Sequence, residues 1–116
     1  MGWSPMQHMS WGGSGDDGGT GHGGKVVTAA GTAEVIAASR YAKRVMIKAE
    51  NSNTGLIGVG KSTVDISITG ADSATMGYHL AADQETPWLI CDGDDLASVY
   101  IDATVSGDGV TFIYEG

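Results

Sequence analysis

The C-terminal stretch Asp94–Gly116 constrains the fold of this 116-residue chain most, because apolar and polar residues alternate along it in two successive runs. The first run has apolar residues at every second position: Val99, Ile101, Ala103 and Val105. The second run resumes the pattern after a Ser-Gly-Asp-Gly segment: Val110, Phe112 and Tyr114. A two-residue period is typical of a β-strand with one buried face, and the glycines accept the positive φ values of a tight turn. The stretch predicts a C-terminal β-hairpin.

From Lys25 onward, turn-forming residues recur at the spacing that is typical of a β-sandwich or barrel. Further candidate strands occupy residues 25–30, 32–38, 44–49, 56–59, 64–68, 78–82 and 85–91. In the strand 44–49 we expect Val45, Ile47 and Ala49 to face inward. Residues 33–41 are also compatible with a helix, because alanine favours helices, although the β-branched neighbours favour a strand. We expect an all-β fold, a small antiparallel β-sandwich or barrel of about eight strands, with a flexible Gly-rich N-terminal arm.

The composition divides the chain into an arm, residues 1–24, and a single β domain, residues 25–116. Residues 12–24 consist almost entirely of Gly, Ser, Thr, Asp and His, as expected of a flexible tether. The tip before the tether is apolar and contains Trp3, Met6, Met9 and Trp11. Aromatic and methionine side chains contribute strongly to protein contacts, so the tip predicts an anchor that inserts into a partner. The alternative is a disordered leader that packs loosely on its own domain.

The net charge of -8 is distributed unevenly along the chain. All six Lys and Arg residues fall between Lys25 and Lys61, whereas residues 62–116 contain acids and no base. Such asymmetry favours docking between opposite charges, and Arg40, Lys43 and Arg44 are the candidates to meet an acidic neighbour. The alternative is that the acidic composition only keeps the protein soluble. Nucleic-acid binding is disfavoured, because phosphate contacts need a concentrated basic surface.

Residues Gly55–Ser62, GLIGVGKS, match the G-x-x-x-x-G-K-[ST] pattern of a phosphate-binding loop. That loop must lead into a helix, yet residues 63–70 alternate like a strand. The crossover helices of a nucleotide-binding α/β domain are also missing from the pattern. We therefore expect no nucleotide binding.

Other reactive residues give weaker signals. Asp92, Asp94 and Asp95 form an acidic cluster of the kind that binds calcium, but without the ligand spacing of an EF-hand, so a structural turn is favoured. The histidines His8, His22 and His79 are too far apart in sequence to predict a metal site. The single cysteine, Cys91, lies in an apolar run and is expected to be buried and inert. We expect no enzymatic activity, no cofactor and no metal.

No apolar run is long enough to span a membrane, and the N-terminus lacks the features of a secretory signal. These observations predict a protein that is made in a reducing cytosol and used there or in a particle assembled there.

Three segments together carry a resemblance: NTGLIGVG (residues 53–60), GYHLAADQETPWLICDGDDL (residues 77–96) and DDLASVYIDATVSGDGVTFIY (residues 94–114). They resemble a small β domain of tailed-bacteriophage virion proteins, among them capsid decoration (cement) and head-fibre proteins, and the resemblance spans about residues 26–116. It implies a structural protein of the virion, assembled in the host cytoplasm, that binds the major capsid protein or other virion proteins. It also implies a homotrimer at local symmetry axes of the shell.

Two other functions remain open from the sequence. One is a minor tail, neck or head-fibre component, in which the arm plugs into a larger assembly. The other is a carbohydrate-binding β-sandwich module, whose sugar platform would come from Tyr78, Trp88 and Tyr100.

Overall fold

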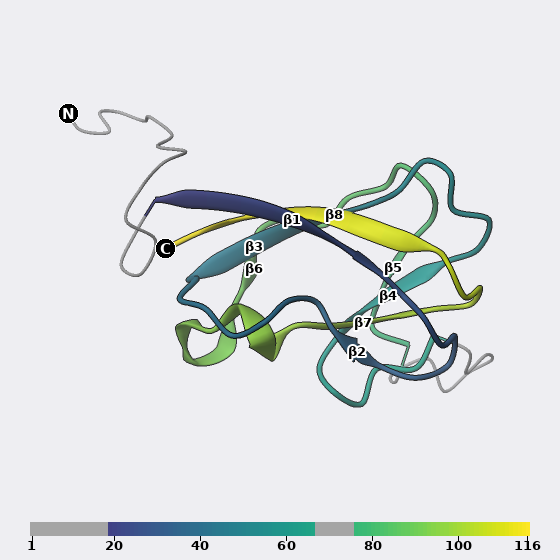
Figure 1. The fold of residues 1–116 in the computed structure, drawn as a ribbon, viewed down its shortest axis with the longest axis horizontal. Coiled ribbons are helices and arrows are strands. Elements are labelled where there is room, and N and C mark those ends of the chain that lie inside the picture. Colours follow the sequence, from purple (N-terminus) through teal and green to yellow (C-terminus); the bar gives the residue numbers. More distant parts are fainter. Residues whose placement is uncertain (1–18, 67–75) are drawn as a thin grey trace.

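The protein is an antiparallel β-sandwich, seen in a computed structural model that describes residues 19–66 and 76–116 (Figure 1). The first sheet has the order β1 (Thr20–Val26), β8 (Gly109–Glu115), β3 (Arg44–Ala49), β6 (Leu89–Ile90). The second sheet has the order β2 (Glu34–Val35), β7 (Tyr100–Ala103), β4 (Ile57–Gly60), β5 (Tyr78–Leu80). Two single-turn 3-10 helices, η2 (Asp92–Asp94) and η3 (Leu96–Ser98), precede β7. The predicted all-β fold is confirmed.

The core lies between the two sheets and follows the alternation predicted for the central strands. Val45, Ile47 and Ala49 of β3 are fully buried, as expected. They pack with buried residues of β8 and of the second sheet: Val110, Phe112, Tyr114, Ile57, Val59, Ile101 and Ala103. None of the helices in the described part of the chain is long and apolar enough to cross a membrane.

The predicted C-terminal hairpin is wrong, because its two strands belong to different sheets. β7 pairs with β2 and β4, whereas β8 pairs with β1 and β3. The connecting residues 104–108 cross from one sheet to the other, and the Asp108 carboxylate holds them by accepting hydrogen bonds from the Thr54 and Gly55 amides. Alternation reports which face of a strand is buried, and it does not report which strand lies beside it.

The first strand begins at Thr20, so the predicted domain boundary at Lys25 falls inside β1. Its glycines have a packing role. A Cβ atom on Gly21 would lie 2.2 Å from the Tyr114 hydroxyl, and one on Gly23 would lie 2.7 Å from Cζ of Phe112. The two aromatic rings of β8 therefore lie across the inner face of β1, and residues 20–24 belong to the sheet rather than to a flexible tether.

The strand predicted at residues 64–68 is absent over the described residues 64–66, which cover the outer face of the second sheet instead. Val64 and Ile66 are buried there, and the Ile66 amide donates a hydrogen bond to the Asp102 carboxylate at 3.0 Å. The Asp102 carboxylate thus takes the place of the backbone acceptor that a neighbouring strand would supply. Residues 33–41 contain β2 and no helix, and the strands predicted at 32–38 and 85–91 are each only two residues long.

Candidate docking surface

The three basic residues predicted to meet a partner lie together at one end of the first sheet. Arg44 is the first residue of β3 and is opposite Glu115, the last residue of β8. The Lys43 amide donates to the Glu115 carbonyl at 2.8 Å, and the Arg40 guanidinium lies 5.3 Å from the centre of the Tyr114 ring. Thr20, at the start of β1, also pairs with Glu115. The chain therefore enters the sandwich at the same end that carries the basic residues (Figure 1).

These basic residues differ in how far their charges are compensated. The Arg44 Nε donates to Oε2 of Glu115 at 2.8 Å, and its guanidinium stacks 4.6 Å from the Trp88 ring. Within residues 19–66 and 76–116, neither Arg40 nor Lys43 forms an ion pair. Both are exposed, so two positive charges at this end are available to an acidic partner.

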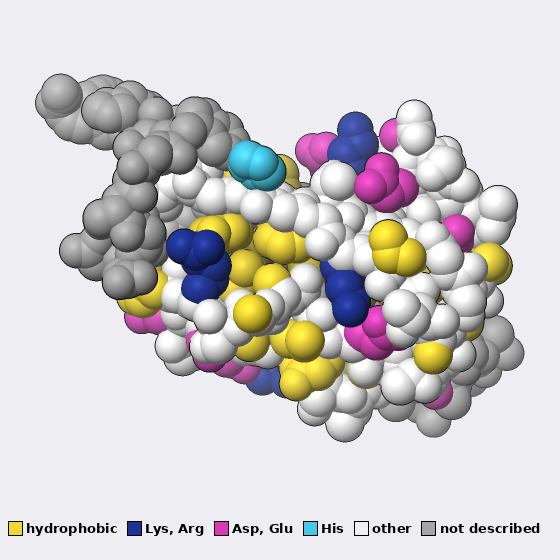
Figure 2. All heavy atoms as spheres, in the orientation of Figure 1, with side chains coloured by type: hydrophobic (Ala, Val, Ile, Leu, Met, Phe, Trp, Pro, Cys, Tyr) yellow, Lys and Arg dark blue, Asp and Glu magenta, His cyan; other side chains and the backbone are white. Residues whose placement is uncertain are grey.

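A groove of about 360 Å³ opens along one side of the sandwich, between β1 and residues 36–40. Phe112, Tyr114, Ile36 and Leu96 provide its apolar lining, and Arg40 lies at its border. Figure 2 shows apolar side chains gathered in this hollow, between two groups of basic side chains. We call this feature the aromatic groove.

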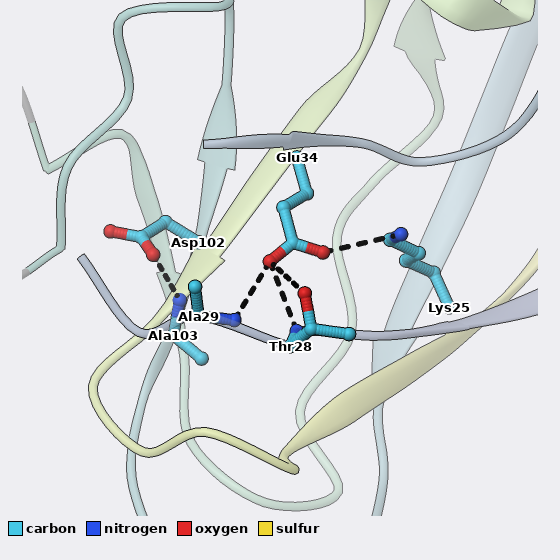
Figure 3. Close-up of polar contacts among 6 residues, drawn as sticks. All are labelled: Lys25, Thr28, Ala29, Glu34, Asp102 and Ala103. Atoms are coloured by element: carbon cyan, nitrogen blue, oxygen red, sulfur yellow. Dashed lines mark hydrogen bonds and ion pairs between the residues drawn. The ribbon is translucent and has the colours of Figure 1, made fainter. Parts of the chain in front are cut away.

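Beyond the aromatic groove, an ion pair joins the edges of the two sheets. Nζ of Lys25 lies 3.2 Å from Oε1 of Glu34, and Oε2 of Glu34 accepts hydrogen bonds from the Ala29 amide and from the amide and hydroxyl of Thr28 (Figure 3). Burial alone would raise the pKa of Glu34, but these hydrogen bonds outweigh it and hold the pKa below its usual value. The sandwich is therefore closed near Lys25 and open toward Thr20.

The opposite side of the sandwich has a second, smaller hollow of about 220 Å³ between β6 and β5. Tyr78 and Ile90 line it and are 49% and 79% exposed. Lys61 and Asp92 form an ion pair at its border. Ile90 pairs with Arg44 in the first sheet, but neither Arg40 nor Lys43 lines this hollow.

The residues that match a phosphate-binding loop form strand β4 and the turn after it. Ile57–Gly60 pair with both β7 and β5, so this segment is a central strand and not a loop that precedes a helix. A Cβ atom on Gly58 would lie 2.4 Å from the Met76 carbonyl oxygen, and one on Gly60 would lie 3.2 Å from Cβ of Val64. Because these glycines have no side chains, residues 64–66 and Met76 can pack closely against this face of β4. Lys61 forms an ion pair with Asp92.

The acidic cluster forms the turns before β7. Asp95 caps η3 by accepting a hydrogen bond from the Ala97 amide at 2.9 Å, and it also accepts one from the Ser39 hydroxyl at 2.9 Å. These bonds lower the pKa of Asp95. The described residues hold no group of three or more His, Cys, Asp or Glu placed to bind a metal ion. The structural role favoured from the sequence accounts for the contacts of Asp92 and Asp95.

Cys91 is buried, as predicted. Burial raises the pKa of its thiol, and the nearby carboxylates of Asp94, Asp95 and Asp92 raise it further. The thiol is therefore held in its protonated, weakly nucleophilic form.

The three aromatic residues considered for a sugar platform lie on different surfaces. Trp88 stacks with Arg44, whose side chain projects from the outer face of the first sheet. Tyr78 and Ile101 both pair with Val59, so their side chains lie on the same face of the second sheet. Tyr100 precedes Ile101 in β7 and therefore projects from the opposite face. No shared aromatic platform results.

The sequence interpretation missed two buried carboxylates, Asp102 and Asp108. Asp102 is fully buried and accepts hydrogen bonds from the amides of Gly31 (2.9 Å), Ile66 (3.0 Å) and Ala103 (2.8 Å). The alternation placed Asp102 on an outward face, and no local motif indicated that residues 64–66 would cover that face. Both carboxylates tie loops to the sheets.

The predicted anchor residues lie outside the described residues: Trp3, Met6, Met9 and Trp11. Comparisons with protein-family models, curated proteins and solved structures found no match to this chain.

Proposed function

We propose that the protein is a structural component of a tailed-phage virion, a decoration (cement) protein that binds and stabilises the head shell. The observation that carries this proposal is the shared location of Arg40, Lys43 and Arg44 with the point where the N-terminal arm joins β1. A basic end and an apolar arm on one side of a small sandwich suit docking onto a larger acidic assembly.

In this function the protein acts by burying surface between subunits and carries out no chemical step. The arm supplies apolar anchors through Trp3, Met6, Met9 and Trp11, while Arg40 and Lys43 meet acidic side chains of the major capsid protein or of another virion protein. Arg44 contributes less, because Glu115 already compensates its charge. A specific interface of this kind buries at least about 1,000 Å². The trimeric state remains part of the proposal and depends on the resemblance.

The test is binding of purified protein to shells that lack it, measured by co-sedimentation over a range of protein concentrations. The double variant Arg40→Glu/Lys43→Glu should bind at least about 10-fold more weakly, because it reverses two exposed charges at the docking end. Lys48→Glu is the matched control, since Lys48 is exposed near the other end of β3.

The anchor is tested separately by Trp3→Ala, with the circular dichroism spectrum and the unfolding midpoint as measures of an intact fold. We expect the fold to be kept and shell binding to fall. Equal shell binding by the wild type, the double charge variant and Trp3→Ala would contradict the proposed docking surface.

A further inference from the structure

We propose that the aromatic groove is the docking site for residues 9–17 of the same chain, with Trp11 over the groove and Asp16 and Asp17 near Arg40 and Lys43. This inference goes beyond shell binding, because it describes the free protein. In the free protein Met9 and Trp11 contact the protein's own domain, and binding to a shell would release residues 9–17, so that Met9, Trp11, Arg40 and Lys43 contact the partner.

The chemistry of the groove calls for an occupant that is both apolar and acidic. Phe112 and Tyr114 form an aromatic floor, and β1 borders the groove with His22, Gly23 and Gly24. Arg40 borders the groove with its guanidinium over the Tyr114 ring, where it can also stack on a second aromatic ring. A large apolar side chain followed by carboxylates matches these features.

Residues 9–17 have this composition and are attached at the right place. Their sequence, MSWGGSGDD, has Met9 and Trp11 ahead of a glycine-rich stretch that ends in Asp16 and Asp17. The charges are complementary, because Arg40 and Lys43 form no ion pair within the described residues.

The length of the connecting chain permits this docking. Gly19, the first described residue, accepts a hydrogen bond from the Gly116 amide at the same end of the first sheet. Trp11 is eight residues before Gly19 and reaches up to about 29 Å from it. Gly24, on the groove, is five residues along β1 and therefore about 17 Å from Gly19.

The same chain is favoured over a second copy because the connection is short. A short flexible linker gives an effective concentration of the order of millimolar, and closing so small a loop costs little entropy. Docking within one molecule is therefore expected to be independent of protein concentration.

The experiment measures acrylamide quenching of Trp11 in the full chain with Trp3→Phe and Trp88→Phe, which leaves Trp11 as the single tryptophan. In this background we expect quenching at least about 3-fold weaker than in urea. Ala38→Phe should restore strong quenching, because Ala38 is an exposed residue that lines the groove. Thr32→Phe, in an exposed turn, is the matched control and should keep Trp11 protected.

Charge reversal gives a second, independent measurement. Arg40→Glu should increase the quenching of Trp11, and adding Asp16→Lys and Asp17→Lys to that variant should reduce it again. Quenching of Trp11 that is as strong in the folded protein as in urea would overturn the inference. Protection that disappears on dilution would also overturn it, because the occupant would then be a second copy. Neither measurement uses shells, so this inference and the proposed function can fail separately.

Discussion

The carboxylates that hold the loops and the basic residues at the docking end use their charges in opposite ways. Asp102 and Asp108 accept hydrogen bonds from backbone amides of distant segments, and Asp102 is fully buried while doing so. Glu34 accepts hydrogen bonds from the amides of the preceding turn, Thr28 and Ala29. Arg40 and Lys43 are exposed and form no ion pair within the described residues. The acidic side chains therefore stabilise the fold, whereas the basic ones have no acidic partner within the described residues. Substitutions of the two sets should separate stability from binding.

The largest effect is expected at Asp102. Asp102→Ala leaves three backbone amides without their acceptor, so the free energy of unfolding should fall by about 3 kcal/mol. Urea unfolding followed by circular dichroism measures the change. Asp92→Ala is the matched control, because Asp92 is exposed and its ion pair with Lys61 should contribute no more than about 0.5 kcal/mol. An equal fall in the free energy of unfolding in the two variants would contradict the distinction between buried structural carboxylates and exposed ones.

The second-largest effect is expected at the glycines of β1, whose close packing distinguishes this folded strand from the Gly-rich arm. Gly23→Val would place a side chain against the Phe112 ring and should destabilise the protein by about 2 kcal/mol. Gly24→Val faces outward, where a Cβ atom meets only the Val110 carbonyl oxygen at 3.3 Å, and should cost less. Thermal unfolding of both variants tests the order. A Gly23→Val protein as stable as the wild type would contradict the packing of β1 against β8.

A smaller, pH-dependent effect is expected at Glu34. Because its pKa is lowered in the folded state, its contribution to stability is fully present above pH 4.5, the ordinary value, and is lost as the pH falls through the lowered pKa. Glu34→Gln should therefore cost about 1 kcal/mol at pH 7, and the difference from the wild type should shrink in acid. Urea titrations at several pH values between about 7 and 3 give the comparison. A pH-independent difference would show that the carboxylate charge has no part in these contacts.

The smallest effect on stability is expected at Lys43. Lys43→Glu should change the free energy of unfolding by less than about 0.5 kcal/mol, because the side chain is exposed and only the backbone of Lys43 bonds to Glu115 and Cys91. The same variant should weaken shell binding. A loss of stability comparable to that of Asp102→Ala would place Lys43 among the residues that maintain the fold.

The sequence predicted the class of fold, the inward residues of β3 and the buried cysteine, because each depends on local alternation and apolarity. It mispaired β7 with β8, since alternation is equally compatible with a hairpin and with a crossing between sheets. It also attributed the glycines of residues 20–24 to flexibility, whereas the rings of Tyr114 and Phe112 require Gly21 and Gly23.

The candidate site was predicted only in part. The positions of Arg40, Lys43 and Arg44 in sequence suggested a basic cluster, but their alignment with the start of β1 depends on the pairing of β3 and β1 with β8. The aromatic groove was not foreseen, because its lining comes from four separate segments of the chain.

The measurement that tests the central claim most directly is copy number, obtained by quantitative mass spectrometry of purified particles with this chain counted against the major shell protein. A decoration protein predicts a ratio near one, or one trimer for each facet element of the shell. A few copies per particle would move the protein to the tail or neck, and its absence from the particles would contradict a role in the virion.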